Sequence, residues 1–378
     1  MDYKGIKILQ AQDLDLDLFE GQYPLTKGIS YNSYLLFDRD IAIVDTVDER
    51  KTNDWLYYLE NALDGKTPKY VIVHHVEPDH SGSLKALLKK YPNITLVGNT
   101  KTVSMLKSFY DMDFKEVKLV NSGDELSLGT KTLKFIFAPM VHWPEVMVSY
   151  IKELKVLFSA DAFGTFGFDL DNWEDEASRY YFGIVGKYGM QVSKLISAAK
   201  ELELDAILPL HGPIIDSNIN YYLDLYDKWS KYEPTKKGVT IFVASVYGNT
   251  MKAASCLHEE LRKLNIPSEI VDLNKCDVSY AVSKAFLYEK AVFASVTYNG
   301  DMFPSMKDFL NRLIERQYQN RTVGFIENGS WGIVSAKQMK SCLEGLKNLT
   351  MLDDVVSIKS SMNDANLEQI KALALSLK

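Results

Sequence analysis

The feature that most constrains this chain is a short run of metal-binding side chains directly after an apolar, strand-like segment. Within six residues the run holds His75, Glu77, Asp79 and His80. The preceding segment, Tyr70–Val73, is apolar, so we expect the four side chains to emerge together at a strand end. This density of imidazoles and carboxylates predicts a metal site.

Three further residues of metal-binding type each follow another apolar, strand-like run: His142, Asp161 and His211. The complete set, four imidazoles and three carboxylates, is too large for one tetrahedral zinc and favours two metals that share a bridge. Such mixed ligands suit iron, manganese or zinc, and three carboxylates with a bridging hydroxide would offset much of the charge of two ferric ions. Strand alternation points His74 away from His75, which predicts a supporting or packing role for His74.

Length and composition exclude several classes of protein. A chain of 378 residues predicts two or three domains, and its net charge of −7 without a basic, aromatic-rich cluster argues against nucleic-acid binding. No signal-peptide h-region follows Met1, and no apolar run approaches the roughly 20 residues that cross a bilayer. Cys256, Cys276 and Cys342 form no CxxC pair, which excludes an iron–sulfur or rubredoxin-type site and favours reduced thiols in a cytoplasmic protein.

The first part of the chain predicts an α/β sandwich. Expected strands cover 33–37, 41–45, 70–74, 94–98, 116–120, 133–137, 146–151 and 155–159. Helical patterns cover 83–90, 102–109 and 174–204. Many strands with a few long helices indicate sheets packed together beneath helices.

A polar segment with Pro and Gly, Tyr232–Gly238, predicts a linker, and we place the domains at 1–234 and 235–378. Beyond the linker, strands and helices alternate: strands at 239–245, 268–272, 291–295 and 322–327, and helices at 251–264, 279–287, 306–316 and 336–346. Apolar strands joined by helices predict a parallel, doubly wound sheet.

The first strand–helix turn of this second domain has the composition of a phosphate cradle. Backbone N–H groups at a helix start, with hydroxyl and amide side chains, can hold a phosphate without a Lys or Arg. Loops after the third and fourth strands offer glycines for close approach and aromatic faces for a flavin ring. The predicted FMN-binding residues are Ser245, Val246, Tyr247, Gly248, Asn249, Thr250, Thr297, Tyr298, Asn299, Gly300, Ser330, Trp331 and Gly332.

The pattern H-x-E-x-D-H, followed by a distant His, Asp and His, resembles the metallo-β-lactamase fold, with Glu77 where the hydrolases have His. Joined to a flavodoxin-like module, it resembles the flavodiiron proteins, or A-type flavoproteins, over essentially the whole chain. The resemblance implies an N-terminal αββα diiron domain and a C-terminal flavodoxin-like FMN domain. It also implies that one iron is bound by His75, Glu77 and His142, the other by Asp79, His80 and His211, with Asp161 as the bridge.

The resemblance further implies an oxidoreductase that reduces O2 to water, NO to N2O, or both. The chain ends at Lys378 without a rubredoxin module, so an external electron donor is expected: rubredoxin, a flavin reductase or a deazaflavin. The family also implies a head-to-tail homodimer or a dimer of dimers. Two alternatives stay open: a zinc-dependent hydrolase with an appended flavodoxin module, and an FMN electron carrier without diiron catalysis.

Two departures from the family pattern bear on the substrate. Phe19-Glu20-Gly21 stands where many members have a His between Phe and Gly, and Tyr23 follows. If that His tunes the substrate pocket, its absence leaves the O2-versus-NO preference open. Glu20 is interpreted as a surface acid or as a supporting acid beside the metals. The gap between Asp161 and His211 also looks shorter than usual.

Overall fold

The computed structural model describes residues 2–169, 171 and 173–378. The chain forms two compact units, each described here by itself. The first unit contains Met1–Tyr180 and Met190–Asp227, and the second contains Tyr181–Gly189 and Lys228–Lys378.

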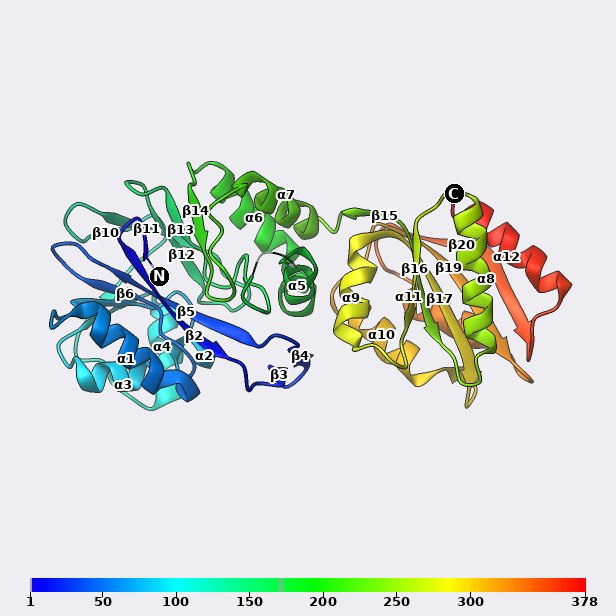
Figure 1. Ribbon diagram of the computed structural model, residues 1–378, viewed down its shortest axis with the longest axis horizontal. Helices are drawn as coiled ribbons and strands as arrows, with labels where there is room; N and C mark the ends of the chain where they lie inside the picture. Colours follow the sequence, from blue (N-terminus) through cyan, green and yellow to red (C-terminus); the bar gives the residue numbers. More distant parts are fainter. Residues whose placement is uncertain (1, 170, 172) are drawn as a thin grey trace. The chain divides into compact units, whose positions relative to one another are not determined.

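The first unit contains a seven-stranded sheet that is covered on one face by a layer of helices. Its strand order is β1-β2-β5-β6-β7-β8-β9, antiparallel from β1 to β6 and parallel from β6 to β9. The helices α1 (Thr52–Leu63), α3 (Leu84–Lys90) and α4 (Thr100–Tyr110) lie on its outer face (Figure 1). The strands are β1 (Asp2–Tyr3), β2 (Ile6–Asp13), β5 (Ile29–Leu36), β6 (Ala42–Val44), β7 (Tyr70–Ile72), β8 (Thr95–Gly98) and β9 (Val117–Leu119).

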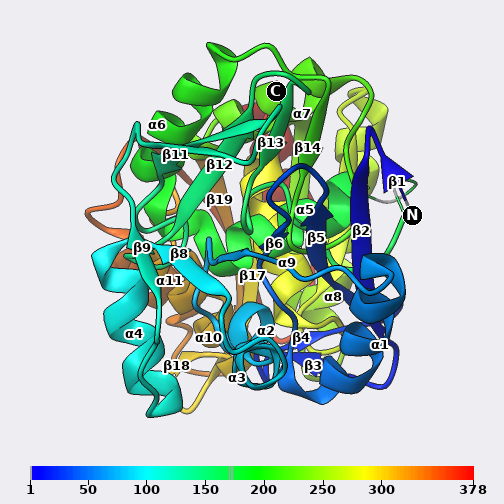
Figure 2. The ribbon, with the colours of Figure 1, turned by 90° about the vertical axis from the view of Figure 1, so that its left-hand side faces the viewer.

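The second sheet of this unit has five strands in the order β10-β11-β12-β13-β14, and it is also covered by helices. Figure 2 shows β11–β14 facing the first sheet, and Figure 1 shows α6 (Gly189–Lys200) and α7 (Ile219–Ser230) on the outer side. This αββα sandwich confirms the predicted fold class. The strands are β10 (Glu125–Ser127), β11 (Thr132–Phe137), β12 (Met147–Ile151), β13 (Val156–Phe158) and β14 (Ala206–Leu208); a hairpin of β3 (Leu18–Phe19) and β4 (Tyr23–Pro24) stands apart.

The second unit is a doubly wound parallel sheet with the order β16-β15-β17-β19-β20, as predicted. The short β18 (Asp301–Met302) pairs antiparallel with β17. The strands are β15 (Lys236–Ala244), β16 (Ser268–Asp272), β17 (Tyr288–Tyr298), β19 (Arg321–Gly329) and β20 (Leu349–Lys359). The helices are α8 (Asn249–Lys263), α9 (Val278–Leu287), α10 (Pro304–Glu315), α11 (Ser335–Leu343) and α12 (Asp364–Ser376).

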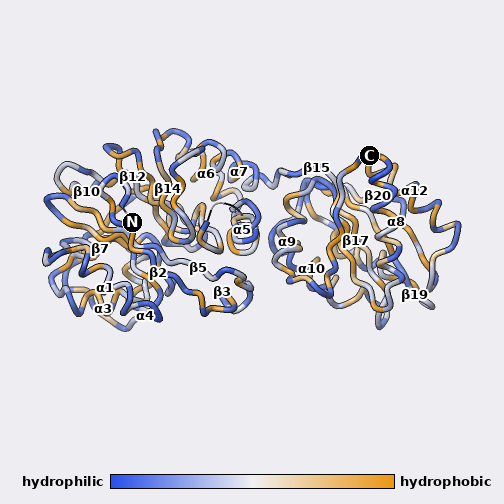
Figure 3. The backbone as a smooth tube through the Cα atoms, viewed as in Figure 1, coloured by the Kyte–Doolittle hydropathy of each residue, from blue (hydrophilic) through white to orange (hydrophobic). Residues whose placement is uncertain are grey.

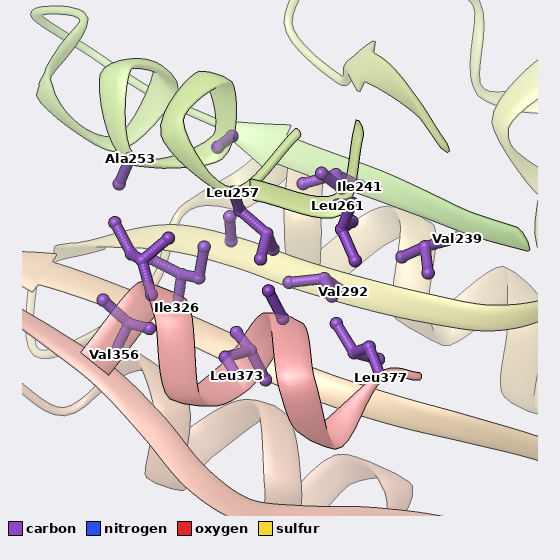
Figure 4. Close-up of a cluster of buried hydrophobic side chains, with 14 of the residues drawn as sticks. Val239, Ile241, Ala253, Leu257, Leu261, Val292, Ile326, Val356, Leu373 and Leu377 are labelled. Atoms are coloured by element: carbon purple, nitrogen blue, oxygen red, sulfur yellow. The ribbon is translucent and has the colours of Figure 1, made fainter. Parts of the chain in front are cut away.

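The core of the second unit forms where α8 and α12 pack on one face of this sheet. Leu257 and Leu373 are fully buried and meet Val292 and Ile326 from the strands (Figure 4). The hydrophobic stretches along β17 in Figure 3 follow from burial of both faces, which favours near-continuous apolar strands.

The segment predicted as a linker, 232–238, is held by contacts within the second unit. Tyr232 is buried, its carbonyl accepts a hydrogen bond from Arg321 Nη1 at 2.6 Å, and Lys236–Gly238 already belong to β15. A polar composition with Pro and Gly does not reveal that a buried guanidinium later in the chain will hold this backbone.

The predicted helix at 174–204 changes its type along its length. It comprises α5 (Trp173–Tyr180), a π-helical turn (Tyr181–Val185), a 3-10 turn and α6. The irregular part belongs to the second unit, where Phe182 stacks on Phe286 with ring centroids 4.5 Å apart and Arg316 Nη2 donates to the Gly183 carbonyl at 2.9 Å. Tertiary contacts, which periodicity does not report, interrupt the regular helix.

Several elements were not predicted from the sequence, including β2, α1, α7, β20 and α12. Among the described residues, no helix combines the length and apolar character needed to cross a membrane.

Candidate metal centre and flavin site

Loops at the strand ends of the first unit bring all seven predicted metal-binding residues together. His75 and Glu77 lie between β7 and the short helix α2 (Pro78–Ser81), which itself carries Asp79 and His80. The remaining three follow β11, β13 and β14 in order. The structure assembles them into two groups: His75, Glu77, His142 and Asp161, and Asp79, His80 and His211.

The ligand atoms of the first group converge on one point. Glu77 Oε2 lies 3.1 Å from His75 Nε2 and 2.9 Å from His142 Nε2, and the two Nε2 atoms are 3.3 Å apart. Asp161 Oδ2 completes the group at 3.3 Å from His75 Nε2 and 3.2 Å from His142 Nε2. Ligand atoms about 2.1 Å from a tetrahedral metal are separated by about 3.4 Å, so these spacings fit a metal ion.

The other carboxylate oxygen of Asp161 faces the second group. Asp161 Oδ1 lies 3.0 Å from His80 Nε2 and 3.8 Å from His211 Nε2. Asp79 Oδ2 is 3.5 Å from His80 Nε2 and 3.2 Å from His211 Nε2. One carboxylate therefore presents one oxygen to each group, which is the geometry of a bridge between two metals.

The hydrogen-bonding state of these atoms tests whether a metal pair fits. Both carboxylate oxygens of Asp79 and of Asp161, together with the Nε2 atoms of His80 and His211, are buried and have no hydrogen-bond partner among the described residues. Buried polar atoms are normally satisfied, so their convergence without hydrogen bonds is explained by coordination to cations. The donor set therefore fits two metal ions.

The opposite charges of the buried imidazoles and carboxylates shift the pKa values of both kinds of group. Burial disfavours the imidazolium form, yet Asp79 and Asp161 outweigh it and raise the pKa of His80 to about 9. Against the same burial, the adjacent carboxylates of Asp161 and Glu77 raise the pKa of His142 to about 9. Burial also opposes ionisation of Glu77, but His142 and His75 hold the pKa of its carboxyl far below the usual range. Without metal, protons on the imidazoles balance the carboxylates.

Glu145 supports the first group and was missed in the sequence. Its Oε1 accepts hydrogen bonds from His75 Nδ1 at 2.8 Å and from the Val76 N–H at 2.9 Å, and its side chain is fully buried. Burial opposes its ionisation, but the contact with His75 outweighs this and lowers the pKa of Glu145. The only signal available was an acid three residues after His142, which by itself indicates no contact.

His74 supports the site from behind, as expected. Its Nδ1 lies 2.7 Å from Asp45 Oδ2 and its Nε2 lies 2.9 Å from Ser149 Oγ, so it joins neither group. On the second group, His211 Nδ1–H donates to the carbonyl of Ser30 at 2.8 Å. Backbone and supporting side chains thus fix which imidazole nitrogen faces the metals.

The hairpin that carries Glu20 and Tyr23 borders the second group. The Phe19 ring lies edge-on to His211 with centroids 5.4 Å apart, and the buried Tyr23 packs on Phe166. Glu20 is exposed, yet desolvation by its surroundings and the charge of Glu77 raise its pKa to about 7. Its charge is thus coupled to the metal groups although it belongs to neither.

The second unit contains a cavity of about 620 Å³ at the carboxyl ends of β15, β17 and β19. Every predicted FMN-binding residue except Gly248 lines it. Val296 near the end of β17 and Asn328 and Gly329 at the end of β19 also contribute, as does Ser360 after β20, which was not predicted because that strand was not identified. A crevice at the carboxyl ends of a parallel sheet is the expected place for a ligand.

The cavity wall fits a phosphate and a flat ring. Gly248 has φ +87° at the N-cap of α8, a conformation that favours glycine, and the first helical residues, Asn249 and Thr250, line the cavity where a helix N-terminus favours a phosphate. Tyr247 and Trp331 are 92% and 85% exposed, which leaves both aromatic faces open to a ligand. The residues therefore fit FMN.

Known proteins with similar sequences include a beta-lactamase-like family and proteins that are named for flavins. The ODP family beta lactamase model matches residues 29–212. An uncharacterised protein of Methanocaldococcus jannaschii is 29% identical over 374 residues, covering 97% of this chain and 94% of the relative. An anaerobic nitric oxide reductase flavorubredoxin of Vibrio vulnificus is 27% identical over 85% of this chain and 68% of its own length. Two diflavin flavoproteins are longer, and the chain spans only 57% and 49% of them.

Solved structures match nearly the whole chain. The rubredoxin:oxygen oxidoreductase of Desulfovibrio gigas superposes with a TM-score of 0.92 at 26% identity, covering 99% of this chain and 96% of that one. The flavodiiron protein of Giardia intestinalis gives a TM-score of 0.89 at 26% identity, covering 99% and 94%. With two ligand groups sharing Asp161 and a cavity lined by the predicted FMN-binding residues in its second unit, the chain is similar to the flavodiiron proteins over nearly its whole length.

Proposed function

We propose that this chain is a flavodiiron oxidoreductase that reduces O2 to water, NO to N2O, or both, with two irons and FMN. The single observation that carries the proposal is the placement of Asp161 between two ligand groups in a chain that also contains a cavity lined by the predicted FMN-binding residues. Redox-inert zinc would give the flavin no function, whereas iron and FMN when bound would supply electrons for these multi-electron reductions.

Each predicted metal-binding residue has a proposed role. His75, Glu77 and His142 hold one iron, Asp79, His80 and His211 hold the other, and Asp161 bridges them. These residues lie within the proposed diiron domain, 1–234, and the FMN-binding loops lie within the proposed FMN domain, 235–378. The burial of Asp161 at 1% exposure keeps bulk water from competing for its oxygens.

The electron supply and assembly are proposed from the family. The similar structure from Desulfovibrio gigas is named for rubredoxin, and an external rubredoxin or another reductase is our proposed donor. The proposed assembly is a head-to-tail homodimer or a dimer of dimers. Sedimentation of the FMN-loaded protein would test the assembly, and stopped-flow reduction with separate donors would test the electron source.

The proposed reaction is tested by measuring iron, zinc and FMN per chain and then O2 and NO consumption in separate electrode assays with a competent donor. We expect about two irons and one FMN per chain and consumption of at least one gas. Zinc without iron would favour the hydrolase alternative. Normal gas consumption by His75→Ala and Asp161→Ala would instead favour an FMN electron carrier.

A further inference from the structure

The two metal positions receive different support from the residues behind them. In the first group, His75 Nδ1 contacts a carboxylate, Glu145 Oε1, at 2.8 Å. In the second group, His211 Nδ1 contacts a neutral carbonyl, that of Ser30, and His80 Nδ1 has no hydrogen-bond partner among the described residues. Hydrogen bonds to an ionised partner are roughly twice as strong as neutral ones, so the two positions are not equivalent.

Glu145 also joins the two loops that carry the first group. Its carboxylate binds the His75–Val76 backbone and ring, while its own segment follows His142 by three residues. The Glu145 carbonyl accepts a hydrogen bond from Asn99 Nδ2 at 2.6 Å, which anchors the segment to the start of α4. The two loops are therefore fixed relative to each other before any metal binds.

We propose that Glu145 is a positioning residue that fixes His75 for its metal and makes the position formed with Glu77 and His142 the tighter of the two. This inference rests on the proposed two-metal site. The carboxylate holds the proton of His75 on Nδ1, so Nε2 presents its lone pair to the metal, and the negative charge makes the imidazole a stronger donor. The second position, where no described carboxylate contacts the Nδ1 atoms of His80 and His211, releases its metal first.

The chemistry of the Glu145 contact allows its charge and its geometry to be separated. A single oxygen, Oε1, accepts both hydrogen bonds, and Oε2 has no partner within the described part of the chain. Glu145→Gln therefore can keep both hydrogen bonds through its amide oxygen and removes only the charge. Glu145→Leu removes charge and hydrogen bonds together.

The test uses two backgrounds that each leave one metal position. His211→Ala retains the first position, and His142→Ala retains the second. Each FMN-loaded chain is titrated with Co²⁺ alone, and the affinity and the visible absorption bands of the bound cobalt are recorded. In the His211→Ala background we expect affinity to fall about 10-fold for Glu145→Gln and about 100-fold for Glu145→Leu, with altered bands.

In the His142→Ala background, the same Glu145 changes should alter affinity by less than about twofold. Glu125→Gln, on an exposed site of β10, serves as the matched control and should alter neither titration. Equal losses in both backgrounds, or unchanged cobalt bands in Glu145→Leu, would overturn the positioning role. Failure of the unmutated chain to bind two metals would overturn the proposed function as well, whereas two metals with no Glu145 effect would overturn this inference alone.

Discussion

The metal groups and the flavin cavity differ in how far their binding residues are buried. His75, His80 and His211 are completely buried, and hydrogen bonds that His75 and His211 donate to Glu145 and Ser30 fix the orientation of these two rings. The flavin cavity instead presents exposed aromatic residues on loops. Burying charged groups is costly unless they are paired, so the metal-binding side chains are held by hydrogen bonds. A flat, mostly apolar ring can instead bind in a pocket formed largely by backbone and exposed aromatic side chains.

The strongest way to break this comparison is to remove the residue shared by both metal groups. Asp161→Ala should reduce O2 or NO consumption at least about 100-fold, because it removes a ligand atom from each position at once. FMN binding should be unchanged, since Asp161 lies in the first unit and the flavin cavity in the second. Gas electrodes, metal analysis and flavin absorbance measure the three quantities.

The exposed Asp353→Asn is the control for loss of a carboxylate elsewhere and should leave gas consumption unchanged. If Asp161→Ala retained two metals and full turnover, the bridge would be disproved.

The second largest expected effect is that of pH, which should change the affinity for metal but not the affinity for FMN. Because the pKa values of His80 and His142 are raised to about 9 without metal, each proton that a metal displaces lowers apparent affinity about tenfold per pH unit below 9. We therefore expect metal affinity to rise between pH 6 and 9 while FMN affinity stays nearly constant. Titrations of Zn²⁺ and FMN at several pH values would check this, and parallel pH profiles would contradict it.

The metal-free protein should show the opposite stability trend over the same window. A histidine whose pKa rises from about 6.5 unfolded to about 9 folded stabilises fully below pH 6.5, and the benefit is lost as pH rises through 9. Thermal unfolding with and without metal at pH 6.5 and 9.5 measures both trends. A metal-free protein that is more stable at pH 9.5 would count against the assigned charges.

A smaller effect is expected from the backbone of the flavin site. Gly248→Val places a side chain at φ +87°, which costs about 1–2 kcal/mol and should weaken FMN binding by about tenfold while leaving metal content unchanged. Fluorescence titration with FMN gives the affinity. Gly345→Val is a matched control, because it also has a positive φ and open space but is not flanked by cavity-lining residues, as Gly248 is by Tyr247 and Asn249. An equal loss in both variants would indicate general destabilisation.

The smallest expected effect is the loss of FMN affinity when an exposed aromatic side chain of the flavin cavity is removed. Trp331→Ala removes one aromatic face, and a stacking contribution of about 0.5–1.5 kcal/mol predicts a roughly two- to tenfold loss of FMN affinity. Tyr57→Ala, an exposed aromatic in the first unit, should change nothing in the same titration. An unchanged affinity in Trp331→Ala would mean that this face does not contact the ring.

Particular elements show why part of the fold was predictable. The parallel strands β15, β17 and β19 are buried on both faces, so their apolar runs identified them directly. Strand β20 was missed because Asp353 and Asp354 interrupt its apolar pattern, and with it the contribution of Ser360 to the flavin cavity was lost. The π-helical turn and the held segment at Tyr232 depend on contacts from distant residues.

By itself, the sequence determined which side chains could bind metal and flavin, because their chemical types and their positions after apolar runs are local properties. Only the tertiary structure decided that Asp161 presents one oxygen to each group, that Glu145 supports His75, and that Glu20 is coupled to the charges beside it. Distance and burial set the strength of a coordinating or electrostatic interaction, and folding brings these groups together from loops far apart in the chain.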